Sequence, residues 1–160
     1  MVPGLEGRGR LAHERCAVNR WAWGEMTPEG DYRDHWDAIE APYIYKHDGH
    51  YYLFVSLGMC CRGINSTYHT RVGRSESVTG PYLDKDGKDL LLGGGTNVAT
   101  TVGPFIGPGH AGIIEVNGKS WFSCHFYDGT ARGASKLSIR PLTWIPDGWP
   151  ELGTLDDQSR

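Results

Sequence analysis

The sequence predicts an all-β fold built from repeated antiparallel sheets. Short apolar runs alternate with turn residues from Ala38 onward, and no segment has the periodicity of an amphipathic helix. A similar hairpin occurs twice, and the 23 glycines among 160 residues fit a chain with many turns.

The first predicted sheet begins with a hairpin. Residues 41–46 alternate as a strand, His47-Asp48-Gly49 predicts a tight turn, and residues 51–56 form the return strand. A loop over residues 58–66 follows. Residues 68–75 then predict a third strand.

The second predicted sheet repeats this order after a long connection. The connection contains a turn at residues 84–88 and the triple glycine 93–95, and it ends in a Gly/Pro-rich loop over residues 103–109. After the loop, strands are predicted at residues 111–116, 119–127 and 135–142, with Asn117-Gly118 as the hairpin turn.

The two hairpins are spaced as a structural repeat. Gly49 and Gly118 take the same place in their turns, 69 residues apart. Repeated small antiparallel sheets are typical of β-propeller blades, although a β-sandwich with two similar hairpins remains an alternative. Because a propeller needs about four blades or more, we expect two to three blades of a larger ring here.

The chain divides at about Asp37. Residues 1–37 show no regular alternation and form an N-terminal segment of uncertain order, and residues 38–160 form the partial propeller. Arg8, Arg10 and Arg15 occur near the start without an apolar stretch, so no secretory signal is predicted. The chain would be cytoplasmic if Met1 is the true start.

Composition argues against several classes of partner. The net charge of −3, with 22% charged residues, gives no electrostatic reason to expect nucleic acid or an anionic membrane. The sequence contains no apolar run of about 18 residues, the length that a membrane span requires. Four cysteines are too few for a disulfide scaffold.

Glu40 is the candidate catalytic residue. It precedes a strand and lies between apolar neighbours, where desolvation would raise its pKa toward the value that a general acid needs. A solvated charge at a strand edge is the alternative interpretation. We expect the carboxylate to be partly buried and to face a cleft.

His110 is the candidate metal ligand. It follows Glu40 by 70 residues, which is close to the hairpin repeat, so the two side chains should converge on one cavity. A ring nitrogen there could hold a cation or a water molecule. A structural histidine that hydrogen-bonds to its surroundings is the alternative.

The loop at Cys60-Cys61-Arg62-Gly63 is the third candidate. A vicinal cysteine pair without a second CxxC motif is a weak zinc signal, and packing or loop shape is the simpler interpretation. Arg62 could donate paired hydrogen bonds to a carboxylate or to sugar hydroxyls.

Taken together, these motifs resemble the arabinanases of glycoside hydrolase family 43. The similarity begins at Ala38-Ile39-Glu40-Ala41-Pro42-Tyr43-Ile44 and covers about residues 37–150 in order. The motifs that continue it are Cys60-Cys61-Arg62-Gly63, Ser66-Thr67-Tyr68, Val72-Gly73-Arg74-Ser75, Gly107-Pro108-Gly109-His110 and Asp147-Gly148-Trp149-Pro150. The resemblance implies the C-terminal part of a five-bladed propeller.

The resemblance also implies roles for individual residues. Glu40 would protonate the leaving oxygen of an α-1,5-L-arabinofuranosidic bond, and His110 would lie near a bound calcium or other cation. Cys60, Cys61, Arg62, Gly63 and Thr67 would lie beside the substrate, arabinan or an arabino-oligosaccharide. The expected mechanism is inverting, with two carboxylates about 6.5–9.5 Å apart.

One departure from the family bears on activity. The family's general base and a second, tuning Asp precede the Glu40 motif by far more than the 39 residues found here. The chain is therefore expected to act with another chain or a substitute base, or else to be a non-catalytic remnant that keeps a sugar-facing surface or only the fold. Open blade faces predict a homo-oligomer.

Overall fold

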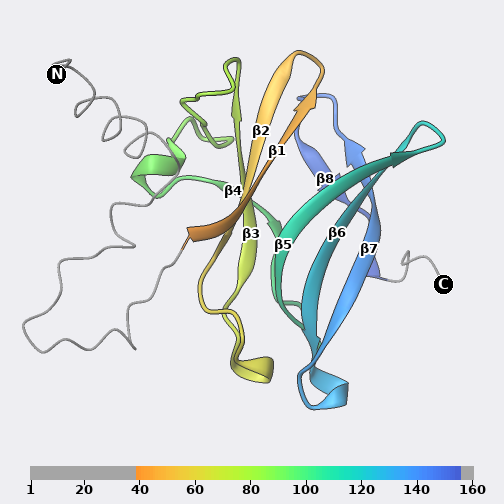
Figure 1. Ribbon diagram of the computed structural model, residues 1–160. Coiled ribbons are helices and arrows are strands. Elements are labelled where there is room, and N and C mark those ends of the chain that lie inside the picture. The colour runs from red at the N-terminus through yellow and green to blue at the C-terminus, as the bar shows by residue number, and fades with distance from the viewer. Residues whose placement is uncertain (1–38, 156–160) are drawn as a thin grey trace, which may run out of the picture.

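The computed structural model describes residues 39–155. The predicted N-terminal segment, residues 1–37, lies outside the described residues. The described part forms two four-stranded antiparallel sheets, each with its strands in sequence order (Figure 1). The first sheet contains β1 (Ile39–His47), β2 (His50–Leu57), β3 (His69–Ser75) and β4 (Thr96–Ala99), and the second contains β5 (Phe105–Val116), β6 (Lys119–Asp128), β7 (Ala134–Trp144) and β8 (Pro150–Leu152).

Three short 3₁₀ helices lie in the connections of the described part: η1 (Gly63–Asn65), η2 (Leu90–Leu92) and η3 (Gly129–Ala131). Within residues 39–155, no helix is long and apolar enough to cross a membrane.

The predicted hairpin repeat is confirmed in detail. Asp48 and Gly49 have φ angles of 44° and 79°, and Asn117 and Gly118 have 52° and 72°. Two consecutive positive φ angles fit the type I′ turn, which suits the twist of a two-residue hairpin. Both hairpins therefore close with the same turn.

The repeat extends from the turns into a β-bulge. In the first sheet the register shifts between Glu40 and Tyr43, and in the second it shifts between Gly109 and Gly112, both 69 residues later. The bulge contains a residue with positive φ in each case, Ala41 at 51° and His110 at 62°. A bulge re-aims the neighbouring side chains, so both sheets bend at equivalent positions.

Three sequence-based expectations for the strands need correction. Residues 103–109 were expected to form a loop, but β5 begins at Phe105 and absorbs the glycines through its bulges. The short outer strands β4 and β8 were not expected at all. They have only 4 and 3 residues, too few for a clear alternation of apolar and polar positions.

The main hydrophobic core lies between the two sheets. Phe54 of β2 is fully buried, and its ring centroid lies 6.2 Å from that of Phe122 in β6. A second core lies on the opposite face of the first sheet, where Tyr82 and Leu90 from the β3–β4 connection cover Val55. The buried residues of the main core are Tyr52, Phe54, Val72, Ala99, Phe105, Ala111, Phe122, Cys124, Leu142 and Trp149.

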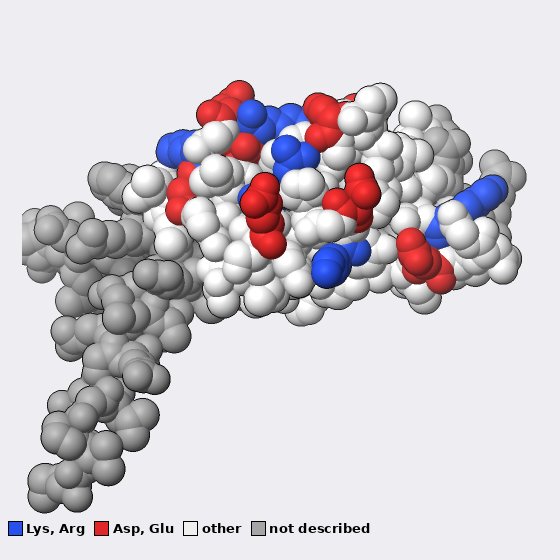
Figure 2. Space-filling view, turned by 90° about the horizontal axis from the view of Figure 1, so that it is seen from above, with Lys and Arg blue, Asp and Glu red and all other residues white. Residues whose placement is uncertain are grey.

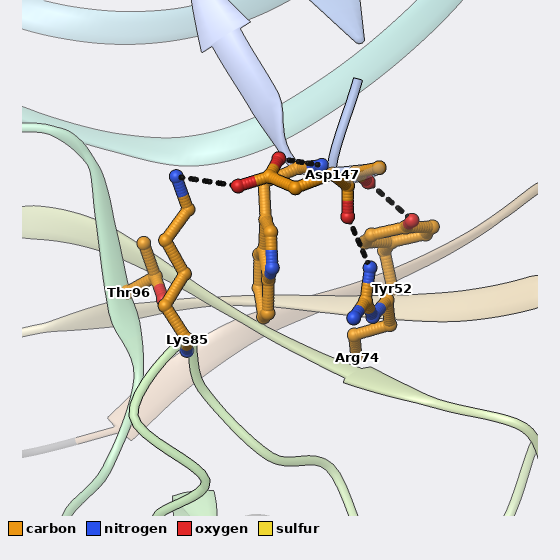
Figure 3. A network of polar contacts seen from close by, with 7 residues as sticks. Tyr52, Arg74, Lys85, Thr96 and Asp147 are labelled. Carbon is orange, nitrogen blue, oxygen red and sulfur yellow. Dashed lines mark hydrogen bonds and ion pairs between the residues drawn. The ribbon is translucent and has the colours of Figure 1, made fainter. Parts of the chain in front are cut away.

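Polar contacts also join the first sheet to the β7–β8 connection (Figure 3). The Tyr52 hydroxyl donates to the Gly148 carbonyl, and the Arg74 guanidinium donates to the Asp147 carbonyl over 2.8 Å. Lys85 pairs with the Asp147 carboxylate at 3.8 Å, an exposed ion pair of the kind that contributes little stability. The two hydrogen bonds to backbone carbonyls, from residues in adjacent strands, fix how the second sheet sits on the first.

The surface carries both signs of charge. On the face seen in Figure 2, acidic and basic side chains are interspersed among neutral ones. On this face, neither sign of charge forms an extended area of its own.

Candidate active site

Glu40 lies at the start of β1, directly before the bulge. Its backbone pairs with Ser56 of β2. The expected partial burial is wrong for the described part of the chain, because Glu40 is exposed. The reason is its place in the first sheet. β1 is an edge strand of that sheet, and Glu40 is the second residue of the strand.

Tyr68 is the buried neighbour of Glu40. Its side chain is 2% exposed and interacts with Ser56 and Glu40. Burial is the largest influence on the pKa of Tyr68 and raises it, Ser56 lowers it, and the negative charge of Glu40 raises it further. The hydroxyl therefore stays protonated at neutral pH and is a hydrogen-bond donor available to the Glu40 carboxylate.

His110 reaches the same region from the second sheet. Its backbone N–H donates to the Ser56 hydroxyl over 2.8 Å, which links β5 to β2 beside Glu40. The imidazole is exposed, and the backbone has the left-handed φ of 62°. A non-glycine residue in this region is uncommon and often marks a functional position.

The glycines before His110 permit direct contact between the sheets. A Cβ atom added to Gly109 would lie 2.0 Å from the Tyr68 ring, and one added to Gly107 would lie 2.2 Å from the Ser66 hydroxyl. Side chains of the β2–β3 connection therefore press on the backbone of β5. This contact explains the Gly-Pro-Gly sequence better than the loop that was expected there.

His125 of β6 was missed from the sequence. Its ring stacks on Tyr68 with centroids 5.5 Å apart and meets Tyr127 edge-on at 5.4 Å. Burial lowers the pKa of His125, His110 lowers it further, and the charge of Glu40 opposes both. His125 is thus close enough to interact electrostatically with both Glu40 and His110.

A signal for His125 did exist in the repeat. His125 follows Ser56 by 69 residues, so it is the second-sheet equivalent of the residue that pairs with Glu40. Its Nε2 atom is buried without a hydrogen-bond partner among the described residues. A buried, unpartnered ring nitrogen is costly, and this makes His125 part of the candidate site.

The loop that contains Cys60 and Cys61 also lies beside Glu40. Cys60 interacts with Glu40, and the backbone N–H of Cys61 donates to the Tyr127 hydroxyl over 2.6 Å. Hydrogen bonding to Cys61 is the main cause that raises the pKa of the Cys60 thiol to about 11, followed by burial. Glu40 adds to the shift.

The other predicted residues of this loop lie farther along it. Arg62 and Thr67 are exposed, and Gly63 faces the backbone of Gly133. The Thr67 hydroxyl accepts a hydrogen bond from the Met59 N–H over 2.9 Å, so it closes the base of the loop. The structure thus places Cys60 at Glu40 and gives Thr67 a loop-closing bond.

The geometry described so far is a carboxylate, two imidazoles, a buried tyrosine and a thiol at the junction of two blade-like sheets. The family profile described as "Glycosyl hydrolases family 43" matches residues 23–150. The chain therefore belongs to glycosyl hydrolase family 43.

The relatives that match in sequence include an arabinofuranosidase and an arabinanase. The chain is 44% identical over 114 residues to the extracellular exo-α-(1→5)-L-arabinofuranosidase ArbA of Cellvibrio japonicus, and 48% identical over 113 residues to the extracellular endo-α-(1→5)-L-arabinanase 1 of Bacillus subtilis. Each alignment covers 71% of this chain and 33% or 34% of the relative. The chain thus spans about a third of the length of these relatives.

Solved structures agree with the sequence comparison. An exo-1,5-α-L-arabinanase from a bovine ruminal metagenomic library matches with a TM-score of 0.72 and 45% identity, covering 73% of this chain and 38% of that one. The Cellvibrio cellulosa α-L-arabinanase complexed with arabinohexaose matches with a TM-score of 0.70 and 43% identity, covering 72% and 36%. The two sheets are therefore part of a five-bladed β-propeller, and the β-sandwich alternative is wrong.

Proposed function

We propose that this chain carries the general acid of an enzyme that hydrolyses α-1,5-L-arabinofuranosidic bonds in arabinan with inversion. The observation that supports this most is the position of Glu40, which lies beside Tyr68 and Cys60 at the junction of the two sheets. The similarity to exo- and endo-acting arabinanases, one of them solved with arabinohexaose, supports the substrate class.

In this mechanism the Glu40 carboxyl gives its proton to the leaving glycosidic oxygen. The Tyr68 hydroxyl and the Cys60 thiol hold the carboxyl in place, and Tyr68 remains a donor because its own pKa is raised by burial. A second carboxylate activates water on the opposite sugar face, about 6.5–9.5 Å away. That carboxylate would come from another chain or from a substitute base within this one.

A non-catalytic role is the second candidate, in which the chain keeps a sugar-facing surface or only its fold. The exposure of Glu40 favours it. A general acid that works near neutral pH needs a desolvated carboxyl, and further blades would have to cover β1 to give Glu40 that environment.

Assembly would provide that cover, and we propose that the chain forms a homo-oligomer. The face of the second sheet turned away from the first exposes apolar side chains: Ile114 is 58% exposed and Leu137 is 67% exposed. Apolar residues gathered on one sheet face mark an interaction surface. Burial of this surface at about 25 cal/mol per Å² favours association.

A single experiment tests both the function and the assembly. Sedimentation at micromolar concentration should show a species heavier than the 17.7 kDa monomer, and the same fraction should release arabinose or arabino-oligosaccharides from linear arabinan. Hydrolysis confined to the oligomer supports assembly of the site. An oligomer or a monomer that releases no sugar supports the non-catalytic role.

We also propose that a cation, calcium or another, binds beside His110. The described residues contain no group of three or more His, Cys, Asp or Glu side chains arranged to hold a metal. One imidazole therefore fits as a single ligand, with water in the remaining positions. Because calcium prefers oxygen ligands, its affinity should be low.

Calorimetric titration with calcium tests this site. We expect a dissociation constant on the order of 10⁻⁴–10⁻³ M, the range of weak calcium sites, and no measurable binding to His110→Ala. His69→Ala is the matched control, because His69 lies in β3 and bonds to the Thr67 carbonyl. Equal calcium binding by both variants would contradict the proposal.

The two curated relatives are named as extracellular enzymes. Their names support action on a polymer outside the cell for this chain as well.

A further inference from the structure

Two adjacent thiols lie in contact beside the candidate site. The Sγ atoms of Cys60 and Cys61 are 2.8 Å apart, and both residues are free cysteines. A disulfide bond measures about 2.0 Å, so a small rotation of the two side chains would bring the sulfurs to bonding distance. Cys61 is exposed and Cys60 is half-buried, which leaves the pair open to reagents.

The loop holds the pair in this arrangement. Cys61 has a left-handed φ of 62°, and its N–H is fixed by the Tyr127 hydroxyl of the second sheet. The base of the loop is closed at Met59, whose carbonyl accepts bonds from the Thr67 N–H over 3.2 Å and the Ser66 hydroxyl over 2.8 Å. The contact of the two sulfurs therefore comes from a loop tied at both its base and its tip.

We propose that Cys60 and Cys61 form a site of reversible oxidation, at which a small-molecule disulfide converts the two thiols into a vicinal disulfide ring beside Glu40. The inference rests on the loop geometry and does not depend on the proposed function. Adjacent Cα atoms are about 3.8 Å apart, closer than the usual 4.4–6.8 Å of bridged cysteines. The ring is therefore strained and readily reduced again.

The exchange proceeds in two balanced steps. The Cys61 thiolate attacks one sulfur of the reagent disulfide, which forms a mixed disulfide and releases one thiolate. Cys60 then loses its proton and attacks the Cys61 sulfur, which closes the ring and releases the second thiolate. The two cysteines are oxidised by two electrons, and the reagent disulfide is reduced to two thiols.

Ring closure changes what surrounds Glu40. In the reduced form the Cys60 thiol interacts with the Glu40 carboxylate. The disulfide sulfur has no proton to donate, so oxidation removes one hydrogen-bond donor that faces Glu40, the candidate general acid. The Tyr68 hydroxyl remains as its neighbour.

Oxidised glutathione added to the folded Cys16→Ser chain tests the proposal, because the fourth cysteine, Cys16, lies outside the described residues and would add a reactive thiol of its own. We expect the intact mass to fall by two hydrogen atoms and the count of reactive thiols to fall by two, with the loss mapped to the peptide that contains Cys60 and Cys61. Dithiothreitol should restore both thiols. The buried Cys124 should not react in the folded chain, which makes it an internal reference.

Two controls separate a ring from ordinary surface thiols. Cys60→Ser should stop at a stable glutathione adduct on Cys61, because no second thiol is present to displace the glutathione. The chain unfolded in urea should form far less of the Cys60–Cys61 disulfide, because the loop no longer holds the two sulfurs together. A stable adduct on Cys60 or Cys61 of the folded Cys16→Ser chain, or disulfide-linked dimers of that chain, would overturn the proposal.

Discussion

Replacing Glu40 by Gln is expected to lower the rate of arabinan hydrolysis by roughly 10²–10⁴-fold, the usual contribution of general acid catalysis. Gln is nearly the same size as Glu and keeps a hydrogen-bond acceptor for Tyr68, but it has no acidic proton for the leaving oxygen. The change should therefore act on kcat, and the thermal midpoint of unfolding should stay within the range of other surface substitutions.

Comparing two substrates shows whether the activity lost in Glu40→Gln is due to the loss of proton donation. An aryl arabinoside whose leaving group is a nitrophenolate needs little protonation to depart, so Glu40→Gln should slow its hydrolysis far less than that of arabinan. Glu151→Gln is the matched control, because Glu151 is an exposed carboxylate on β8. Equal losses on both substrates would mean that Glu40 does not act as the acid.

The fold was predictable where its signals are local. A tight turn is encoded by two residues, so Asp48-Gly49 and Asn117-Gly118 gave both hairpins and their 69-residue spacing. The start of β5 was not predictable, because a Gly-Pro-Gly run normally marks a loop. Here glycines are needed because Tyr68 and Ser66, about 40 positions earlier in the chain, leave no room for a Cβ atom.

The candidate site divides in the same way. Glu40 and His110 stand out in the sequence because each lies in an unusual motif. Tyr68 and His125 do not, because a tyrosine or histidine within a strand normally reads as a core or surface residue. Only the folded structure, in which the Tyr68 ring stacks on His125, shows that both residues lie near Glu40.

The repeat offers a further explanation for the difference between the two sheets. The second-sheet equivalent of Glu40 is Gly109, and the equivalent of Ala41 is His110. Where the first sheet presents a carboxylate, the second has no side chain, because the Tyr68 ring fills that position. Both sheets therefore have the bulge, but the first contributes the carboxylate of Glu40 and the second contributes the imidazole of His110.

Gly109→Ala should therefore be among the most destabilising single changes in the described part of the chain. The added Cβ would lie 2.0 Å from the Tyr68 ring, a distance at which either the ring or β5 must move. Tyr68 is 2% exposed and stacks on His125, so its ring has no free space to enter. Overpacking of this kind typically costs about 1–3 kcal/mol, and the backbone of β5 must shift as well, so we expect a loss at or above the upper end of this range.

Gly112→Ala, three residues later in the same strand, is the matched control. Its added Cβ would meet the Ser123 hydroxyl at 2.8 Å, the end of a short side chain that can rotate away. Neither glycine has a positive φ, so backbone strain is the same for both changes and the difference between them is steric. Urea unfolding of the two variants measures it. Equal midpoints would show that the Tyr68 ring yields to the added methyl group, and that the contact between Tyr68 and β5 does not fix the position of the ring beside Glu40.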